Sequence, residues 1–231
     1  MKLTFLGHSA FLLETSTHTL LIDPFLSGNA QCTTDPASLK PDFILLTHGH
    51  GDHWGDTEAI AKASGATVVA TYELANYAES KGLKTHPMHL GGSHEFPFGR
   101  LKLTVAMHGS SLPGDDGVPI SFGHAAGMII EADNTLIYNA GDTGLFGDMR
   151  LIGDTNAIDL AILPIGDNFT MGPEDALRAV EMLRPKQVVP CHYNTFPPIE
   201  ITNERLTTFE NGLLELGVRA HILCPGCSID V

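Results

Sequence analysis

The chain has 231 residues, of which 43% are hydrophobic and 17% charged. A chain of this size and composition can bury a substantial core, so we expect one globular domain over residues 1–231 and exclude a disordered protein. Its 27 acidic and 13 basic residues give a net charge of -14. Proteins that bind long nucleic acids usually carry a basic strip, because neutralised phosphates release counterions. The charge balance therefore argues against a nucleic-acid partner and favours a small-molecule substrate.

The hydrophobic residues are not grouped as in a membrane or secreted protein. No stretch approaches the roughly 18–20 apolar residues that span a bilayer. The N-terminal residues 1–6 run directly into Gly7-His8, without the hydrophobic region and cleavage site of a secretory signal. We therefore expect a cytoplasmic protein without a membrane partner. A homo-oligomer is compatible with the sequence.

Alternating hydrophobic residues predict strands in the N-terminal half. Residues 2–6, 10–14 and 18–23 are expected to form an antiparallel meander, with a polar turn at residues 15–17. Residues 43–47 form an apolar strand. Beyond it, residues 57–64 and 73–81 have helical composition, and a strand over 67–71 separates them.

A second group of strands and helices is predicted in the C-terminal half. A half-buried strand at 101–107 leads to His108, and the Gly- and Pro-rich residues 109–123 form a long loop. A hairpin at 127–131 and 135–139 ends just before Asp142. Strands 159–164 and 187–190 enclose a helix over 173–183, and helix 203–216 precedes a strand near 219–223. Two groups of strands, each followed by helices, predict an α/β fold, specifically a four-layer αββα sandwich.

Six residues directly after strand 43–47 carry the clearest chemistry. They contain three imidazoles and one carboxylate, in the order His48, His50, Asp52 and His53. Zinc and similar divalent ions prefer imidazole nitrogen and accept carboxylate oxygen. The intervening glycines let the backbone turn tightly enough to point each histidine inward. Because clustered imidazoles without a metal would repel one another on protonation, this pattern indicates a metal site rather than a polar loop.

The pattern His-x-His-x-Asp-His resembles the metallo-β-lactamase fold hydrolases, a superfamily of mononuclear and dinuclear metal enzymes. The segments around Gly7-His8-Ser9, Ile22-Asp23-Pro24 and residues 141–144 and 190–194 are similar to small metal-dependent hydrolases related to the ascorbate-6-phosphate lactonases. The resemblance spans nearly the whole chain. It implies the four-layer fold and three further ligands, at His108, Asp142 and His192.

The resemblance also implies how the ligands divide between two divalent ions. His48, His50 and His108 would form the first site, and Asp52, His53 and His192 the second, with Asp142 bridging both. Zn²⁺ is the expected ion and Mn²⁺ the alternative, because imidazole-rich sites suit zinc. Asp52 is also the expected catalytic residue, since it would orient a metal-activated hydroxide or accept its proton.

Four other residues are candidates for supporting a ligand or contacting the substrate: Asp23, His8, His124 and Asn168. Asp23 ends a strand and would hold a ligating histidine through its other ring nitrogen. In contrast, His86, His89 and His94 have no counterpart in the resemblance and are expected at the surface. Four cysteines in 231 residues do not make a disulfide framework, and we expect residues 224–227 (Cys-Pro-Gly-Cys) to form a turn rather than a redox or zinc site.

These features favour a metal-dependent hydrolase of a small ester, lactone or phosphodiester. A nuclease or phosphodiesterase acting on RNA or DNA is the alternative, against which the acidic charge counts. A diiron redox protein is a third interpretation, but such proteins typically carry Glu at the position of His50 and a flavin domain. Neither a Gly-x-Ser-x-Gly nucleophile motif nor a Gly-rich phosphate loop is present.

Overall fold

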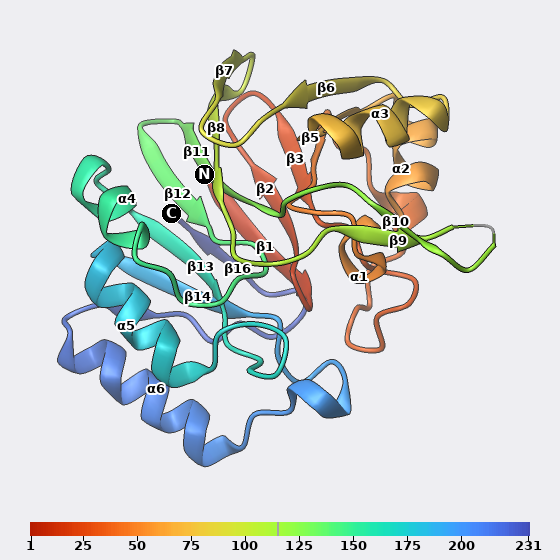
Figure 1. The fold of residues 1–231 in the computed structure, drawn as a ribbon. Helices are drawn as coiled ribbons and strands as arrows, with labels where there is room; N and C mark the ends of the chain where they lie inside the picture. Colours follow the sequence, from red (N-terminus) through yellow and green to blue (C-terminus); the bar gives the residue numbers. More distant parts are fainter. Residues whose placement is uncertain (115) are drawn as a thin grey trace.

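Two seven-stranded sheets form the centre of the protein, as seen in a computed structural model that describes residues 1–114 and 116–231 (Figure 1). The first sheet has the spatial order β16 (Ser228–Asp230), β1 (Lys2–Gly7), β2 (Ala10–Glu14), β3 (Thr19–Ile22), β4 (Phe43–Leu45), β5 (Thr67–Thr71) and β6 (Thr85–Met88). Strands β16 to β3 are antiparallel, and β3 to β6 are parallel. The predicted meander of the first three strands is therefore confirmed.

The second sheet repeats this division into an antiparallel and a parallel half. Its order is β15 (Arg219–Ala220), β14 (Gln187–Cys191), β13 (Leu160–Pro164), β12 (Thr135–Asn139), β11 (Ala126–Ala132), β8 (Gly99–Val105) and β7 (Ser93–Phe96). Strands β7 to β12 are antiparallel, and β12 to β15 are parallel. Most of the parallel strands are connected through α-helices, whereas the connection from β3 to β4 contains only a 3₁₀ turn.

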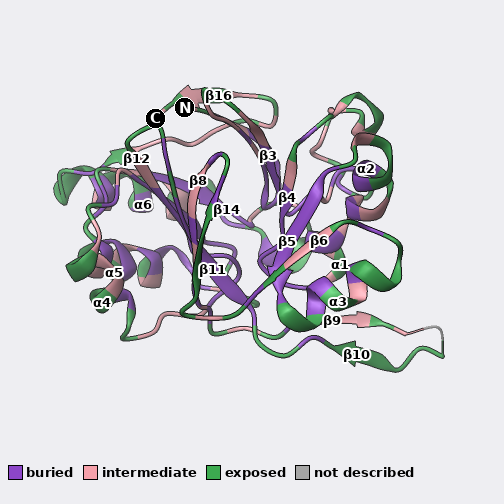
Figure 2. Cartoon of the chain, turned by 90° about the horizontal axis from the view of Figure 1, so that it is seen from above, coloured by how far each residue is buried: buried purple, intermediate pink, exposed green. Residues whose placement is uncertain are grey.

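Helices cover the outer face of each sheet. The first sheet carries α1 (Gly51–Trp54), α2 (Thr57–Ser64) and α3 (Tyr72–Ser80), and the second carries α4 (Met149–Thr155), α5 (Pro173–Leu183) and α6 (Asn203–Glu215). Two 3₁₀ turns, Pro36–Ser38 and Pro197–Ile199, lie in loops. The sheets are largely buried and the helices are exposed on their outer side (Figure 2). The predicted four-layer αββα sandwich is confirmed.

The hydrophobic core is divided by the period-two alternation of the strands. Leu20 and Ile22 face the cluster between the two sheets, whereas Leu21 faces the cluster under α2 and α3. In the second sheet Ile162 lies between the sheets, and Leu163 packs under the helices. Successive side chains of a strand point to opposite faces, so each central strand needs hydrophobic residues at every position.

Several elements were not predicted from the sequence. The edge strands β6, β7 and β16 and the helix α4 are short and carry polar or helix-breaking residues, such as Pro87 in β6 and Gly153 in α4. The expectation that residues 109–123 form only a loop is partly wrong, because β9 (Ser111–Pro113) and β10 (Pro119–Ser121) pair as a projecting hairpin (Figure 1). Such peripheral strands tolerate proline, because the amide groups on their outer edge need not donate a hydrogen bond to a neighbouring strand.

The expected turn at the C-terminus is present and is also closed by a disulfide. Cys224 and Cys227 are bonded, and the Cys227 amide donates to the Cys224 carbonyl at 2.8 Å. The expectation of a plain turn therefore needs correction. The turn is joined to β1, because the amides of Phe5 and Gly226 donate to the carbonyls of Cys227 and Phe5, respectively.

The core between the sheets should dominate the stability. Leu20→Ala removes a fully buried side chain and should lower the free energy of unfolding by about 2–5 kcal/mol, measured by chemical denaturation. Leu214→Ala is the matched control, because Leu214 is 76% exposed on α6 and its loss should cost less than about 0.5 kcal/mol. Equal effects of the two substitutions would contradict this assignment of the core.

Candidate metal centre

One end of the sandwich collects the polar residues that follow the strands of both sheets. Asp23 follows β3, Thr47 and His48 follow β4, and His192 follows β14. Two backbone hydrogen bonds join the sheets here, from Ala126 to the Thr47 carbonyl at 2.9 Å and from His192 to the His8 carbonyl at 2.8 Å. His8, Asp23 and His192 all have positive φ, between 43° and 57°. Such conformations are rare outside glycine and are typical of functional sites.

Three imidazoles form the first group of possible ligands. His48 Nε2 lies 2.9 Å from His50 Nδ1, and His108 Nε2 lies 3.2 Å from the same atom. His48 is fully buried, whereas His50 and His108 are partly exposed. The structure thus brings His108, 58 residues away in sequence, to the histidine motif.

A second group lies beside the first and combines a carboxylate with imidazoles. Asp52, His53, His192 and His8 offer ligand atoms that all lie within 4.8 Å of one another. Asp52 Oδ2 is 3.1 Å from His8 Nε2 and 3.8 Å from His192 Nε2. Asp52 is the most exposed member, while the three histidines are buried.

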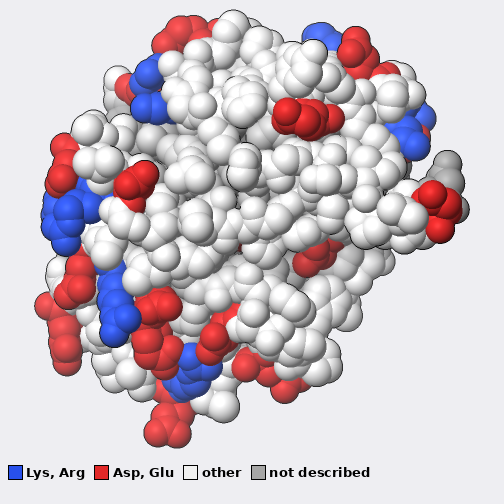
Figure 3. Space-filling model, in the orientation of Figure 1, with Lys and Arg blue, Asp and Glu red and all other residues white. Residues whose placement is uncertain are grey.

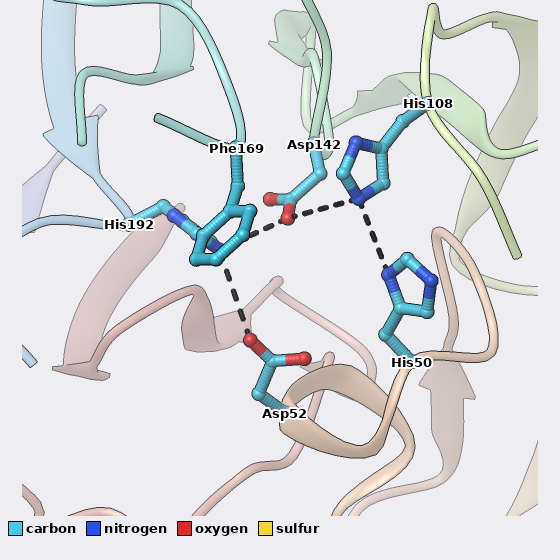
Figure 4. A pocket seen from close by; sticks show the side chains of 6 residues that line it. All are labelled: His50, Asp52, His108, Asp142, Phe169 and His192. Atoms are coloured by element: carbon cyan, nitrogen blue, oxygen red, sulfur yellow. Dashed lines mark hydrogen bonds and ion pairs between the residues drawn. The ribbon is translucent and has the colours of Figure 1, made fainter. Parts of the chain in front are cut away.

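Asp142 lies between the two groups. Its Oδ2 is 3.0 Å from His192 Nε2, 3.3 Å from His53 Nε2 and 3.7 Å from His108 Nε2 (Figure 4). Gly141 precedes it with a φ of 61°, and a Cβ there would approach the Ala126 carbonyl to 2.7 Å. Glycine is therefore needed for the turn that points this carboxylate into the site.

Hydrogen bonds behind the site fix the orientation of three buried imidazoles. Asp23 Oδ2 is 2.8 Å from His53 Nδ1, Thr47 Oγ1 is 3.0 Å from His48 Nδ1, and Thr195 Oγ1 is 2.9 Å from His8 Nδ1. Asp23 also accepts from the amide and the hydroxyl of Thr47. In each case the ring nitrogen remote from the site is held and Nε2 faces inward, as in histidines that bind metals.

The histidines of the centre differ in the direction in which their surroundings shift the pKa. Burial lowers the pKa of His48, His50 and His108, and burial lowers the pKa of His8 to about 4. Burial also opposes charge on His192, but the Asp142 carboxylate outweighs it and raises the pKa of His192 to about 9.

The carboxylates show the converse effect. Burial alone would raise the pKa of Asp52 and Asp142, but the adjoining histidines outweigh it and hold both pKa values below the usual range. For the same reason Asp142 and Asp23 hold the pKa of His53 above its usual value despite its burial. The centre therefore keeps its carboxylates ionised and needs compensating positive charge.

The donor set fits divalent metal ions. Two ligands bound about 2.0–2.1 Å from a tetrahedral ion lie about 3.3–3.4 Å apart, which is close to the separations found here. Among the described residues, the buried atoms His53 Nε2 and Asp142 Oδ1 have no hydrogen-bond partner. Buried polar atoms without a partner are costly, so these atoms are suited to receive an ion.

A cavity of about 230 Å³ opens onto the centre. Among the described residues it is lined by His50, Asp52, His108, Asp142, His192 and Phe169. The Phe169 ring lies across the entrance in front of His192 (Figure 4). A small molecule entering this cavity would meet both groups of possible ligands.

The other candidates from the sequence lie differently. His8 and Asp23 are buried within the centre, but His124 and Asn168 are exposed, and neither lines the cavity. His86 in β6 and His94 in β7 lie side by side outside the cavity, with their rings tilted and the ring centroids 4.3 Å apart. His89 is exposed, as expected.

Sequence reasoning missed Phe169, Thr47 and Thr195. An aromatic residue in a polar loop after a buried strand was the available signal for Phe169. Thr47 directly precedes the histidine motif, which offered a weaker signal. Nothing local marks Thr195, because its role depends on its distance from His8 in the folded chain.

Comparison with known proteins identifies the family. Residues 18–193 match a family model described as the beta-lactamase superfamily domain. A "UPF0173 metal-dependent hydrolase" of Desulforamulus reducens is 58% identical over 98% of both chains, and one of Geobacillus sp. is 56% identical over the full length of both. The solved structure of Igni18, "a novel metallo hydrolase" of Ignicoccus hospitalis, has 36% identity and a TM-score of 0.86, and covers 99% of this chain and 97% of its own. The chain therefore belongs to the metallo-β-lactamase fold superfamily, among the UPF0173 metal-dependent hydrolases.

Proposed function

We propose that this metal-dependent hydrolase is dinuclear and acts on a small ester, lactone or phosphodiester. His48, His50 and His108 would bind one ion, Asp52, His53 and His192 the other, and Asp142 both. The position of the Asp142 carboxylate between the two groups carries this proposal, since a shared carboxylate offsets the repulsion between two cations. Zn²⁺ suits the imidazole-rich donor set best, and Mn²⁺ is the alternative.

When bound, two divalent ions acidify water and polarise an oxygen of the substrate. The side chains of the protein would orient the water molecule and shield the site from bulk solvent. Asp52 borders the cavity and is held ionised by His192 and His8, so its carboxylate can accept a hydrogen bond from a water molecule and orient it. Thr195 holds His8, and His8 in turn fixes Asp52 Oδ2 at 3.1 Å. Phe169 restricts the entry of bulk water at the mouth of the cavity.

The surface supports a small substrate over a polynucleotide. The Lys and Arg side chains visible in Figure 3 lie around the periphery, interspersed with Asp and Glu, and form no continuous basic strip on that face. A surface at -14 repels a polyanion at long range. No helix in the described residues has the length and hydrophobicity needed to cross a membrane.

The purified protein should bind close to two equivalents of zinc or manganese, because seven proposed ligand side chains lie close together in the centre. Elemental analysis after reconstitution and removal of excess metal measures this. Less than about half an equivalent with either ion would rule out a metal centre of the proposed kind. One equivalent at saturation would contradict the dinuclear assignment.

Asp52→Ala should lower kcat by at least about 100-fold while leaving the circular dichroism spectrum and the unfolding midpoint almost unchanged. The substitution removes both a ligand and the group that orients water, and it leaves the hydrophobic core intact. His86→Ala is the control, because this histidine lies in β6 outside the cavity. Similar losses in the two variants would show that the catalytic role is misassigned.

Asp23→Asn should weaken metal binding about 10- to 100-fold, because a neutral amide replaces the carboxylate that orients His53. Competition with a chromogenic chelator measures the affinity without any substrate. Asp133→Asn is the matched control, since Asp133 is an exposed carboxylate bonded to Ser16. Unchanged affinity in Asp23→Asn would exclude a supporting role for this residue.

A further inference from the structure

Three large apolar side chains that line the cavity or lie next to residues of the centre are exposed. Phe169 lines the cavity and is 55% exposed, and Met107, directly before His108, is 60% exposed. Phe196 is 37% exposed, and its ring centroid lies 5.5 Å from that of His8. Exposed apolar side chains grouped at one place usually mark a binding surface.

Backbone hydrogen bonds form a turn in the segment that carries Phe169. The amides of Phe169 and Thr170 both donate to the Asp167 carbonyl, and the Asp167 amide donates to the Met171 carbonyl at 3.0 Å. The Met171 amide donates at 2.9 Å to the carbonyl of Thr143, the residue after Asp142. The turn is therefore tied to the residue next to Asp142, and it places the Phe169 ring beside His192 in the cavity lining (Figure 4).

Apart from the histidines of the centre, the described part of the cavity lining offers no basic side chain to an anionic substrate. Among the described residues that line the cavity, none is Lys or Arg. Arg205 reaches the base of the Phe169 turn, but it is bound to Asp167 at 2.9 Å and to Glu174 at 2.6 Å. These two carboxylates outweigh its single charge. An anion would thus approach apolar and acidic groups, and the loss of its hydration would be poorly compensated outside the metals.

We propose that the cavity selects uncharged carboxylic esters or lactones whose acyl chain lies against Phe169, in preference to phosphodiesters. This proposal rests on the proposed hydrolase function and narrows its substrate class. In the reaction, the oxygen of water forms a bond to the carbonyl carbon and the bond to the alkoxy oxygen breaks. One proton of water goes to the leaving alkoxide, and the acid formed releases the other.

The test compares p-nitrophenyl acetate, butanoate and hexanoate with bis(p-nitrophenyl) phosphate, using the metal-loaded protein. In the wild type, kcat/KM should rise about two- to fourfold for each methylene of the acyl chain that packs against Phe169. Phe169→Ala should remove most of this rise, so that kcat/KM falls more for hexanoate than for acetate. Leu214→Ala should behave like the wild type, because Leu214 lies near Gln187 at the other end of β14.

Two kinetic results would overturn the proposal. The first is faster hydrolysis of the phosphodiester than of the esters, and the second is an equal loss on all esters in Phe169→Ala. If no substrate is hydrolysed, the proposed function fails. The binding of alcohols to the cavity then tests separately whether Phe169 contacts apolar chains. By ligand-observed NMR on the metal-loaded protein, n-hexanol should bind more tightly than n-butanol, and Phe169→Ala should remove the difference. Equal binding of the two alcohols to the wild type would overturn the proposal.

Discussion

The buried carboxylate of Asp142 is the constraint on which the rest of the site depends. An ionised carboxylate away from water is stable only next to positive charge, and three imidazole nitrogens surround this one within 3.7 Å. Protons on the histidines can supply part of that charge. Two divalent ions would supply it without protonating any ligand, and they would occupy the positions toward which the buried ring nitrogens already point.

The sandwich brings these groups together because the segments that follow the strands of the two sheets meet at one end of the molecule, where backbone hydrogen bonds join them. The first sheet contributes Asp23 and the His48–His53 segment after β3 and β4, and the second contributes Asp142 and His192 after β12 and β14. Ligands at the ends of buried strands are fixed by the core beneath them. The orientation of the proposed ligands therefore requires few additional contacts, namely those from Asp23, Thr47 and Thr195.

The parts of the fold that were predictable have local signals. The helix at residues 57–64 ends at Gly65, which adopts a left-handed conformation, and Gly172-Pro173 marks the start of α5. Short polar edge strands such as β7 carry no such signal, because their pairing partner decides their conformation. The histidine motif could be recognised from the sequence because its residues lie within six consecutive positions. The positions of Asp142 and His192 followed only from resemblance, and that of Phe169 depends on a turn anchored by the distant Thr143.

Anomalous X-ray scattering from crystals grown with zinc tests the central claim most directly. Data collected on both sides of the zinc absorption edge locate the ions without reference to activity. The account predicts two peaks about 3.5–4 Å apart, one on each side of the Asp142 carboxylate. The first should contact His48, His50 and His108, and the second Asp52, His53 and His192. A single peak at full occupancy, or two peaks that do not share Asp142, would contradict it.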